Sequence, residues 1–169
     1  MTSKFSALAG ETLTIIQPSI WKNRYELRYK DEVLMEMKPR SVFGFGLIIK
    51  LDDKEWEFYR SNFWKSEIAF REKGKENPVA VYSKKFFSRE GTISLPMGRR
   101  LTIKFGLMKS QYGIYTSSGE CLVIFKDKIS FKTSSVVSIE SSSEILDKYP
   151  WIIVLPWYLT RRKKRSAAH

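Results

Sequence analysis

Few side chains in this chain could do covalent or acid–base chemistry. His169 is the only histidine and the last residue, where a side chain is rarely held in catalytic geometry, so His-based triads and histidine zinc sites are excluded. Cys121 is the only cysteine, which excludes an internal disulfide and a cysteine-cluster metal site and favours a reducing compartment. It lies in the strand-like run ECLVIFK with no histidine to activate it, and we expect a small buried hydrophobe.

The carboxylates and glycines give no stronger candidate. Glu55 and Glu57 in KEWEFYR share one strand face, as a glycosidase pair would, but their basic neighbours fit a solvated face better. Asp52 and Asp53 are typical turn residues. The run FGFG at 43–46 lacks the lysine and Ser/Thr of a phosphate loop, and its glycines indicate a bulge or a barrel corner. We therefore expect no catalytic residue, no metal and no cofactor, and a protein that is not an enzyme.

Positive charge is the chemical property that remains. The formal net charge is +12, and removing the five cations of the run RRKKR at 161–165 leaves +7 on the body. Such a field favours anionic partners. Two groups of cations stand out, the C-terminal run and a set on outward-facing strand positions, although scattered, solvated charge explains the second set equally well. The dispersed set is Arg24, Arg28, Lys65, Arg71, Arg99, Arg100, Lys104 and Lys109. The candidate anion- or lipid-binding residues are Arg99, Arg100, Lys104, Lys109, Arg161, Arg162, Lys163, Lys164 and Arg165.

Several kinds of anionic partner are compatible with this charge. Each cation near an anionic membrane contributes about 1 kcal/mol, so five or six could hold a protein reversibly at a bilayer. An acidic protein is the other partner that we expect. Nucleic acid is less favoured, because the chain has no ribonucleoprotein motif, helix-turn-helix pattern or zinc finger, and most rings fall on inward faces. A basic β-barrel that binds nucleic acid, or a ligand-filled barrel of the lipocalin sort, nevertheless stays open at this point.

The elements that must position these cations are short strands. RYELRYK places Tyr25, Leu27 and Tyr29 on one face, and RLTIKF does the same with Leu101 and Ile103. A period of two means that each strand has one buried and one wet face. Short polar connections join only antiparallel neighbours. The chain from Thr12 to about Ile139 is therefore predicted to form about a dozen antiparallel strands.

The pattern changes near the C-terminus, where a helix is predicted at about 143–160. Between Lys148 and Arg161 lie twelve uncharged residues, which span about 18 Å as a helix, whereas a bilayer core needs about 30 Å. Pro150 and Pro156 would also bend the helix. We expect a buried core helix rather than a transmembrane span, with a C-terminal membrane anchor as the alternative. The predicted core residues are Trp151, Ile152, Ile153, Val154, Leu155, Trp157 and Leu159.

A meander of about twelve strands followed by EILDKYPWIIVLPWYL resembles the Tubby C-terminal-like superfamily. That group includes the Tubby proteins, the plant LURP-one-related proteins and the phospholipid scramblases. The resemblance implies a mainly β fold, a closed antiparallel barrel of about twelve strands around a hydrophobic C-terminal helix. It also implies a binding or scaffold role rather than catalysis. The Lys-Asn-Phe-Gln run of the Tubby proteins is absent, so the resemblance assigns no phosphoinositide-binding residue here.

The expected organisation is one domain. Residues 1–10 are predicted to be a flexible lead-in, 11–160 the barrel with its central helix, and 161–169 a basic tail. The lead-in has no apolar core of the length that a signal peptide needs. We expect a cytoplasmic protein that can attach peripherally to a membrane.

Overall fold

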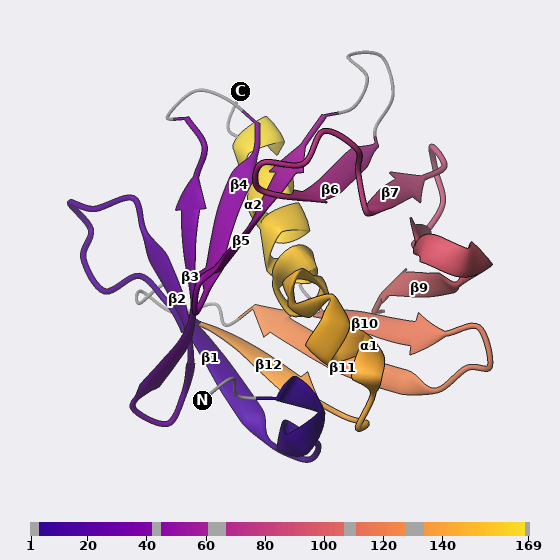
Figure 1. Cartoon of the computed structure of the whole chain (residues 1–169), viewed down its shortest axis with the longest axis horizontal. Coiled ribbons are helices and arrows are strands. Elements are labelled where there is room, and N and C mark those ends of the chain that lie inside the picture. The colour runs from indigo at the N-terminus through magenta and orange to yellow at the C-terminus, as the bar shows by residue number, and fades with distance from the viewer. Residues whose placement is uncertain (1–3, 42–44, 61–66, 107–110, 128–133, 168–169) are drawn as a thin grey trace.

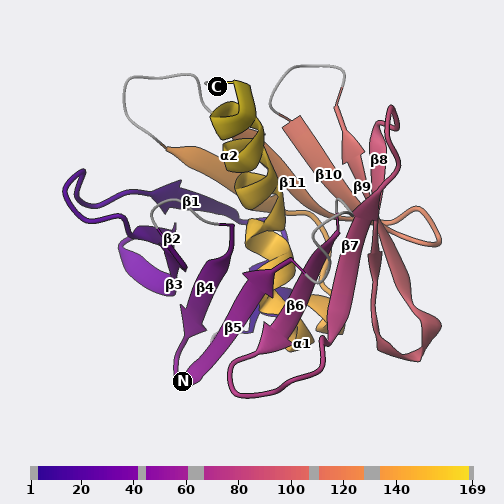
Figure 2. The same cartoon turned by 90° about the horizontal axis from the view of Figure 1, so that it is seen from above.

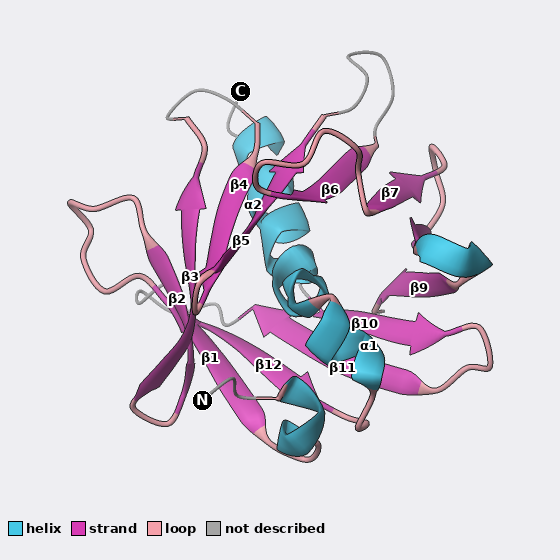
Figure 3. Cartoon of the chain, viewed as in Figure 1, coloured by secondary structure: helices cyan, strands magenta, loops and turns pink. Residues whose placement is uncertain are grey.

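Twelve antiparallel strands form a closed barrel in the computed structural model, which describes residues 4–41, 45–60, 67–106, 111–127 and 134–167 (Figures 1 and 3). Each strand pairs with its neighbours in sequence, and β1 closes the ring by pairing with β12. The predicted fold class is thus confirmed. The strands are β1 (Thr12–Ile16), β2 (Tyr25–Tyr29), β3 (Glu32–Pro39), β4 (Leu47–Leu51), β5 (Lys54–Tyr59), β6 (Ile68–Glu72), β7 (Ala80–Lys84), β8 (Glu90–Ser94), β9 (Arg100–Phe105), β10 (Gln111–Thr116), β11 (Cys121–Asp127) and β12 (Ser135–Ile139).

The alternation of side chains decides which face of each strand points inward. In β9, Leu101 and Ile103 are buried while Arg100 and Lys104 are exposed. The pattern of β9 is the period of two expected of a sheet that covers a core on one side and meets water on the other. In β2, Tyr25 and Leu27 are buried, and Glu26 between them is buried as well, because it is paired with arginines.

The C-terminal segment is three helices in succession rather than one, and the last is the longest. They are α1 (Glu144–Lys148), η3 (Pro150–Val154), which is a 3-10 helix, and α2 (Leu155–Ala167). The Ser143 side chain accepts a hydrogen bond from the Ile145 N–H and so caps α1. Pro150 and Pro156 each stand in the first turn of a helix, where the missing N–H costs least. The prolines therefore divide the segment into helices.

This segment fills the interior of the barrel, and Figure 2 shows the strands surrounding it. Trp151, Ile152, Ile153, Val154 and Leu155 are fully buried, Trp157 is buried, and Leu159 is partly buried. The Trp151 ring stacks on Phe70 with 3.9 Å between ring centroids. The predicted core helix is thus the filling of the barrel. Among the described residues, no helix is both long and apolar enough to cross a bilayer.

The described residues of the predicted lead-in and of the predicted tail include helices that the sequence does not predict. Within the predicted flexible lead-in, η1 (Phe5–Leu8) is a 3-10 helix whose Phe5 is buried in the core. The Ser6 N–H donates to Asp147 Oδ1 at 2.9 Å, which joins η1 to α1. Within the predicted tail, α2 continues to Ala167. Cations at a helix C-terminus interact favourably with its dipole, so the RRKKR run extends the helix.

The stacking of Trp151 on Phe70 predicts a large loss of stability when the indole is removed. We expect Trp151→Ala to lower the free energy of unfolding by about 3–5 kcal/mol, because a large ring is lost from a packed interior. Urea unfolding followed by far-ultraviolet circular dichroism measures this. Trp21→Ala is the control, since Trp21 is exposed and surface substitutions usually change stability by less than about 0.5 kcal/mol. Equal effects of the two substitutions would show that the segment is not the core.

Candidate anion-binding surface at one end of the barrel

The C-terminal turns of α2 emerge at one end of the barrel, beside the described residues of six strand connections. The connections are β1–β2, β3–β4, β5–β6, β7–β8, β9–β10 and β11–β12, and we call this the α2 end. Two contacts show that the C-terminal half of α2 lies at this end. Tyr158 Oη accepts a hydrogen bond from the Gly46 N–H at 3.0 Å in the β3–β4 connection, and Lys164 Nζ lies 2.6 Å from Asp127 Oδ2 at the end of β11. Figure 2 shows α1 and the C-terminus at opposite ends of the helical segment.

Gly46 lets the β3–β4 connection lie close to Phe58 of β5 and to Arg40. Its φ of +127° is a conformation that other residues rarely adopt. A Cβ atom there would lie 3.0 Å from the Phe58 carbonyl oxygen and 3.2 Å from Arg40 Cβ. The glycine therefore permits the hydrogen bond that fixes Tyr158.

Arg161 and Arg162 are half-buried in the mouth of the barrel, each beside aromatic rings. The Arg161 guanidinium carbon lies 4.3 Å from the centre of the Tyr25 ring and 5.3 Å from that of Trp157. The Arg162 guanidinium carbon lies 5.1 Å from the Phe45 ring centre. Burial lowers the pKa of both groups, yet guanidinium groups stay charged at neutral pH. The rings thus hold two positive charges in fixed positions.

Lys84 and Lys163 share one ring on another side of the mouth. Their Nζ atoms lie 4.5 Å and 5.5 Å from the centre of the Phe105 ring. Burial lowers the pKa of the Lys84 ammonium, and the positive charge of Lys163 lowers it further. Two like charges held on one ring repel each other, and a bound anion would relieve that repulsion.

Lys164 has a different role because its charge is paired. Its Nζ lies 2.6 Å from Asp127 Oδ2, while Asp127 Oδ1 accepts a hydrogen bond from Ser135 Oγ at 3.0 Å. Asp127 and Ser135 are paired residues of β11 and β12. This contact fastens the end of α2 to the wall, so it positions the neighbouring cations.

Charge is distributed unevenly between the two ends of the barrel. At the α2 end, the described residues of the six connections include a single carboxylate, Glu67, and the cations Lys22, Arg24, Arg40, Arg60, Lys85 and Arg89. At the opposite end, the corresponding described connections carry the cations Lys30, Lys73, Lys75 and Arg99 and the carboxylates Asp31, Asp52, Asp53, Glu76, Glu120 and Glu140. The five cations of 161–165 add to the excess at the α2 end, which is therefore strongly positive.

The structure divides the cations singled out from the sequence into separate groups. Arg161 to Arg165 all lie at the α2 end. Arg99 lies at the opposite end, where its Nη2 donates to Tyr149 Oη at 3.4 Å, and the exposed Arg100 follows it as the first residue of β9. Lys104 lies on the outside of β9, 3.9 Å from Glu90 Oε1. Lys109 and Lys65 lie outside the described residues.

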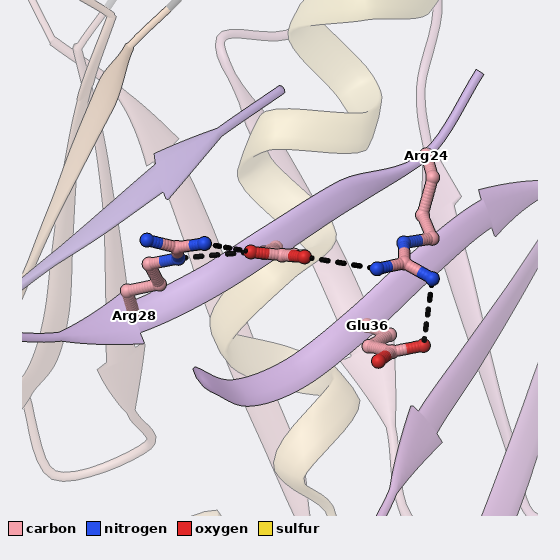
Figure 4. Close-up of polar contacts among 4 residues, drawn as sticks. Arg24, Arg28 and Glu36 are labelled. Carbon is pink, nitrogen blue, oxygen red and sulfur yellow. Dashed lines mark hydrogen bonds and ion pairs between the residues drawn. The ribbon is translucent and has the colours of Figure 1, made fainter. Parts of the chain in front are cut away.

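Some of the dispersed cations are engaged within the outer wall. Arg28 contacts Glu26 Oε2 through Nε at 2.8 Å and Nη2 at 2.5 Å, and Arg24 Nη2 lies 3.2 Å from Glu26 Oε1. Figure 4 shows this network, in which Arg24 also approaches Glu36 Oε2 at 3.8 Å. Arg71 pairs with Glu57 in the same way, at 2.8 Å. These arginines stabilise neighbouring strands, and their role is structural.

Six cations of the α2 end were not predicted from the sequence, namely Lys22, Arg40, Arg60, Lys84, Lys85 and Arg89. A signal was available, because alternate connections of an antiparallel meander fall at the same end of the barrel. Every second connection along the chain, starting with β1–β2, therefore falls at the α2 end, and these residues lie in or beside such connections. The alternation of side chains along each strand distinguishes its two faces but not the two ends of the barrel.

The residues considered for catalysis do not form a reactive group among the described residues. Burial is the main cause that raises the pKa of the Cys121 thiol, and the negative charge of Glu140 adds to it, which disfavours the reactive thiolate. Glu57 is engaged by Arg71 and Glu55 by Lys73 Nζ at 2.6 Å. No group of three or more His, Cys, Asp or Glu side chains suited to a metal ion occurs within the described ranges.

The fold is similar to that of a protein from Arabidopsis thaliana with a known X-ray structure. The TM-score is 0.59, and the match covers 92% of this chain and 96% of the plant protein at 8% sequence identity. No protein-family model matches the chain, and no curated protein sequence does so either. At this identity the likeness shows the fold alone, a barrel of twelve antiparallel strands with a C-terminal helix.

The Glu26 network predicts a stability difference that depends on pH. Burial acts to raise the pKa of Glu26, but the hydrogen bonds and charges of Arg28 and Arg24 together outweigh it, and the pKa is lowered. A lowered carboxyl pKa stabilises the folded state above the unfolded value of about 4.3, and this stabilisation is lost as pH falls through the folded value. We expect Glu26→Gln to cost about 1–3 kcal/mol at pH 7 and progressively less below about pH 4.

Urea unfolding at pH 7 and pH 3 measures this effect. Glu36→Gln is the matched control on the neighbouring strand, because the Glu36 side chain is 43% exposed and such pairs contribute less than about 1 kcal/mol. A cost of Glu26→Gln that is the same at both pH values would contradict the assignment.

Proposed function

We propose that this chain is a non-catalytic binding module, of the Tubby or LURP-one-related type that its sequence resembles, and that it attaches to anionic phospholipid surfaces through the α2 end. The observation that carries the proposal is the excess of cations at one end of the barrel. There the last turns of α2 meet six connections in which Glu67 is the one described carboxylate. In this proposal the protein is cytoplasmic and its attachment to the membrane is peripheral and reversible.

The fixed geometry of these cations supports the proposal. Arg161 lies beside Tyr25 and Trp157, and Lys163 and Lys84 lie beside Phe105. Side chains that are already ordered lose less entropy on binding than free ones. Each cation near an anionic surface contributes about 1 kcal/mol, so a group of this size can hold the protein at a bilayer.

Charge reversal at the α2 end tests the proposal. The test variant combines Lys85→Glu, Arg89→Glu and Lys163→Glu, three exposed residues of this end. The control combines Lys30→Glu, Lys54→Glu and Lys75→Glu, which are exposed at the opposite end. Each variant lowers the net charge from +12 to +6. Binding is measured by co-sedimentation with vesicles of phosphatidylcholine alone or with 30% phosphatidylserine.

We expect the unmodified chain to pellet with the anionic vesicles and to be released by salt. The test variant should bind about 100-fold more weakly, since three favourable contributions of about 1 kcal/mol are removed. The control should bind within about threefold of the unmodified chain. An equal loss of vesicle binding in the two variants would contradict the role of the α2 end, because it would show that binding depends on net charge alone. No pelleting of the unmodified chain would remove the proposal, and binding to an acidic protein or a polynucleotide instead would replace it.

A further inference from the structure

Large apolar side chains are exposed at the α2 end, on two strand connections. Ile20 is 80% exposed and Trp21 is 91% exposed in the β1–β2 connection. Phe86 is 87% exposed and Phe87 is 93% exposed in the β7–β8 connection. Scattered exposed apolar residues are ordinary, whereas adjacent pairs of this size at one end of a molecule indicate contact with an apolar partner.

The backbone at Phe87 adds to this indication. Its φ is +66°, in the left-handed region that bulky residues rarely adopt. The free-energy cost of this backbone conformation is not offset by burial of the Phe87 ring, because the side chain is almost fully exposed. The Phe86 and Phe87 rings contact each other edge to face with 4.3 Å between centroids. The connection thus presents two adjoining rings to its surroundings.

The two apolar pairs lie on opposite sides of the barrel wall. Around the closed ring, β9 to β12 separate the two connections in one direction and β3 to β6 separate them in the other. Figure 2 shows β1 and β2 on one side of α2 and β7 and β8 on the other. A small ligand or a short peptide would not contact both sides, but a flat and extended surface would.

Cations lie next to each apolar pair in the sequence. Ile20 and Trp21 are followed by Lys22, and the phenylalanines lie within the run KFFSR at 85–89. The described residues of these two connections include no carboxylate. Exposed apolar pairs with cations beside them suit an anionic bilayer, in which the cations can contact the charged headgroups while the apolar side chains reach the hydrocarbon below. An acidic protein surface would account for the cations but not for two separated apolar tips.

We propose that Ile20 with Trp21 and Phe86 with Phe87 are two membrane anchors, which enter the interfacial layer of an anionic phospholipid bilayer on either side of the α2 end. The barrel then stands on the membrane by this end, with the C-terminus of α2 directed toward the headgroups. This inference rests on the proposed function and adds the orientation and the inserting residues to it.

The variant Phe86→Ala/Phe87→Ala tests the inference, with Met97→Ala as the control. Met97 is 91% exposed and has a φ of +63°, but it lies at the opposite end in η2 (Pro96–Gly98). Vesicles with 30% phosphatidylserine are titrated at low and at moderate salt. We expect the double variant to bind at least tenfold more weakly at both salt concentrations, with the same dependence on salt. Met97→Ala should bind within twofold of the unmodified chain.

Fluorescence quenching provides a second measurement that does not depend on affinity. Vesicles containing phosphatidylcholine brominated in its acyl chains should quench the emission of the bound protein, and Trp21→Phe should remove most of that quenching. Thermal unfolding of each variant serves as a check on folding.

The outcomes separate the inference from the proposed function. The inference is wrong if the unmodified chain binds anionic vesicles but the double variant binds as well as Met97→Ala does and the emission of Trp21 is not quenched. Attachment would then be by charge alone. If the unmodified chain does not bind anionic vesicles, the proposed function and the inference both fail.

Discussion

The structure depends on the enclosure of one segment that is apolar on every side. From Trp151 to Leu155 each side chain is fully buried, and a helix of this kind has no face that it can present to water. Twelve strands that each bury one face supply the surface that covers it. Closing the sheet into a barrel pairs each described strand with a neighbour on both sides. The apolar interior of the wall and the apolar segment therefore stabilise each other, and neither is expected to form alone.

This enclosure also determines where the positive charge lies. Because η3 and the first turns of α2 fill the barrel, the last turns of α2 must leave it through the mouth. The cations that follow the apolar residues in sequence are thus brought to the α2 end. The contact of Lys164 with Asp127 and that of Tyr158 with Gly46 fix the depth of α2 in that mouth. The packing that stabilises the core thereby arranges the surface through which we propose the protein binds.

The sequence predicts the parts of the fold that depend on local pattern. Alternation in RLTIKF and similar runs reveals the strands, and the twelve uncharged residues before Arg161 reveal a segment too short to span a bilayer. The burial of Phe5 was not predictable, because one aromatic residue in a polar lead-in has no periodicity to reveal its partner. The helical state of 161–165 was missed because a run of cations is also typical of a solvated tail. The site was harder still, since Lys84 and Lys163 are distant in sequence and only the register of the barrel brings them to one ring.

The enclosure of the C-terminal segment is tested most directly by hydrogen exchange of its backbone amides. We expect the amides of 151–155 to exchange only through global unfolding, with the same free energy as the central residues of β4, β5 and β11. Mass spectrometry of the corresponding peptides, under conditions where exchange reports the opening equilibrium, gives this comparison. Exchange of 151–155 that is much faster than that of the strands, at a free energy well below that of global unfolding, would contradict the account. It would show that the helical segment leaves the barrel while the wall stays intact.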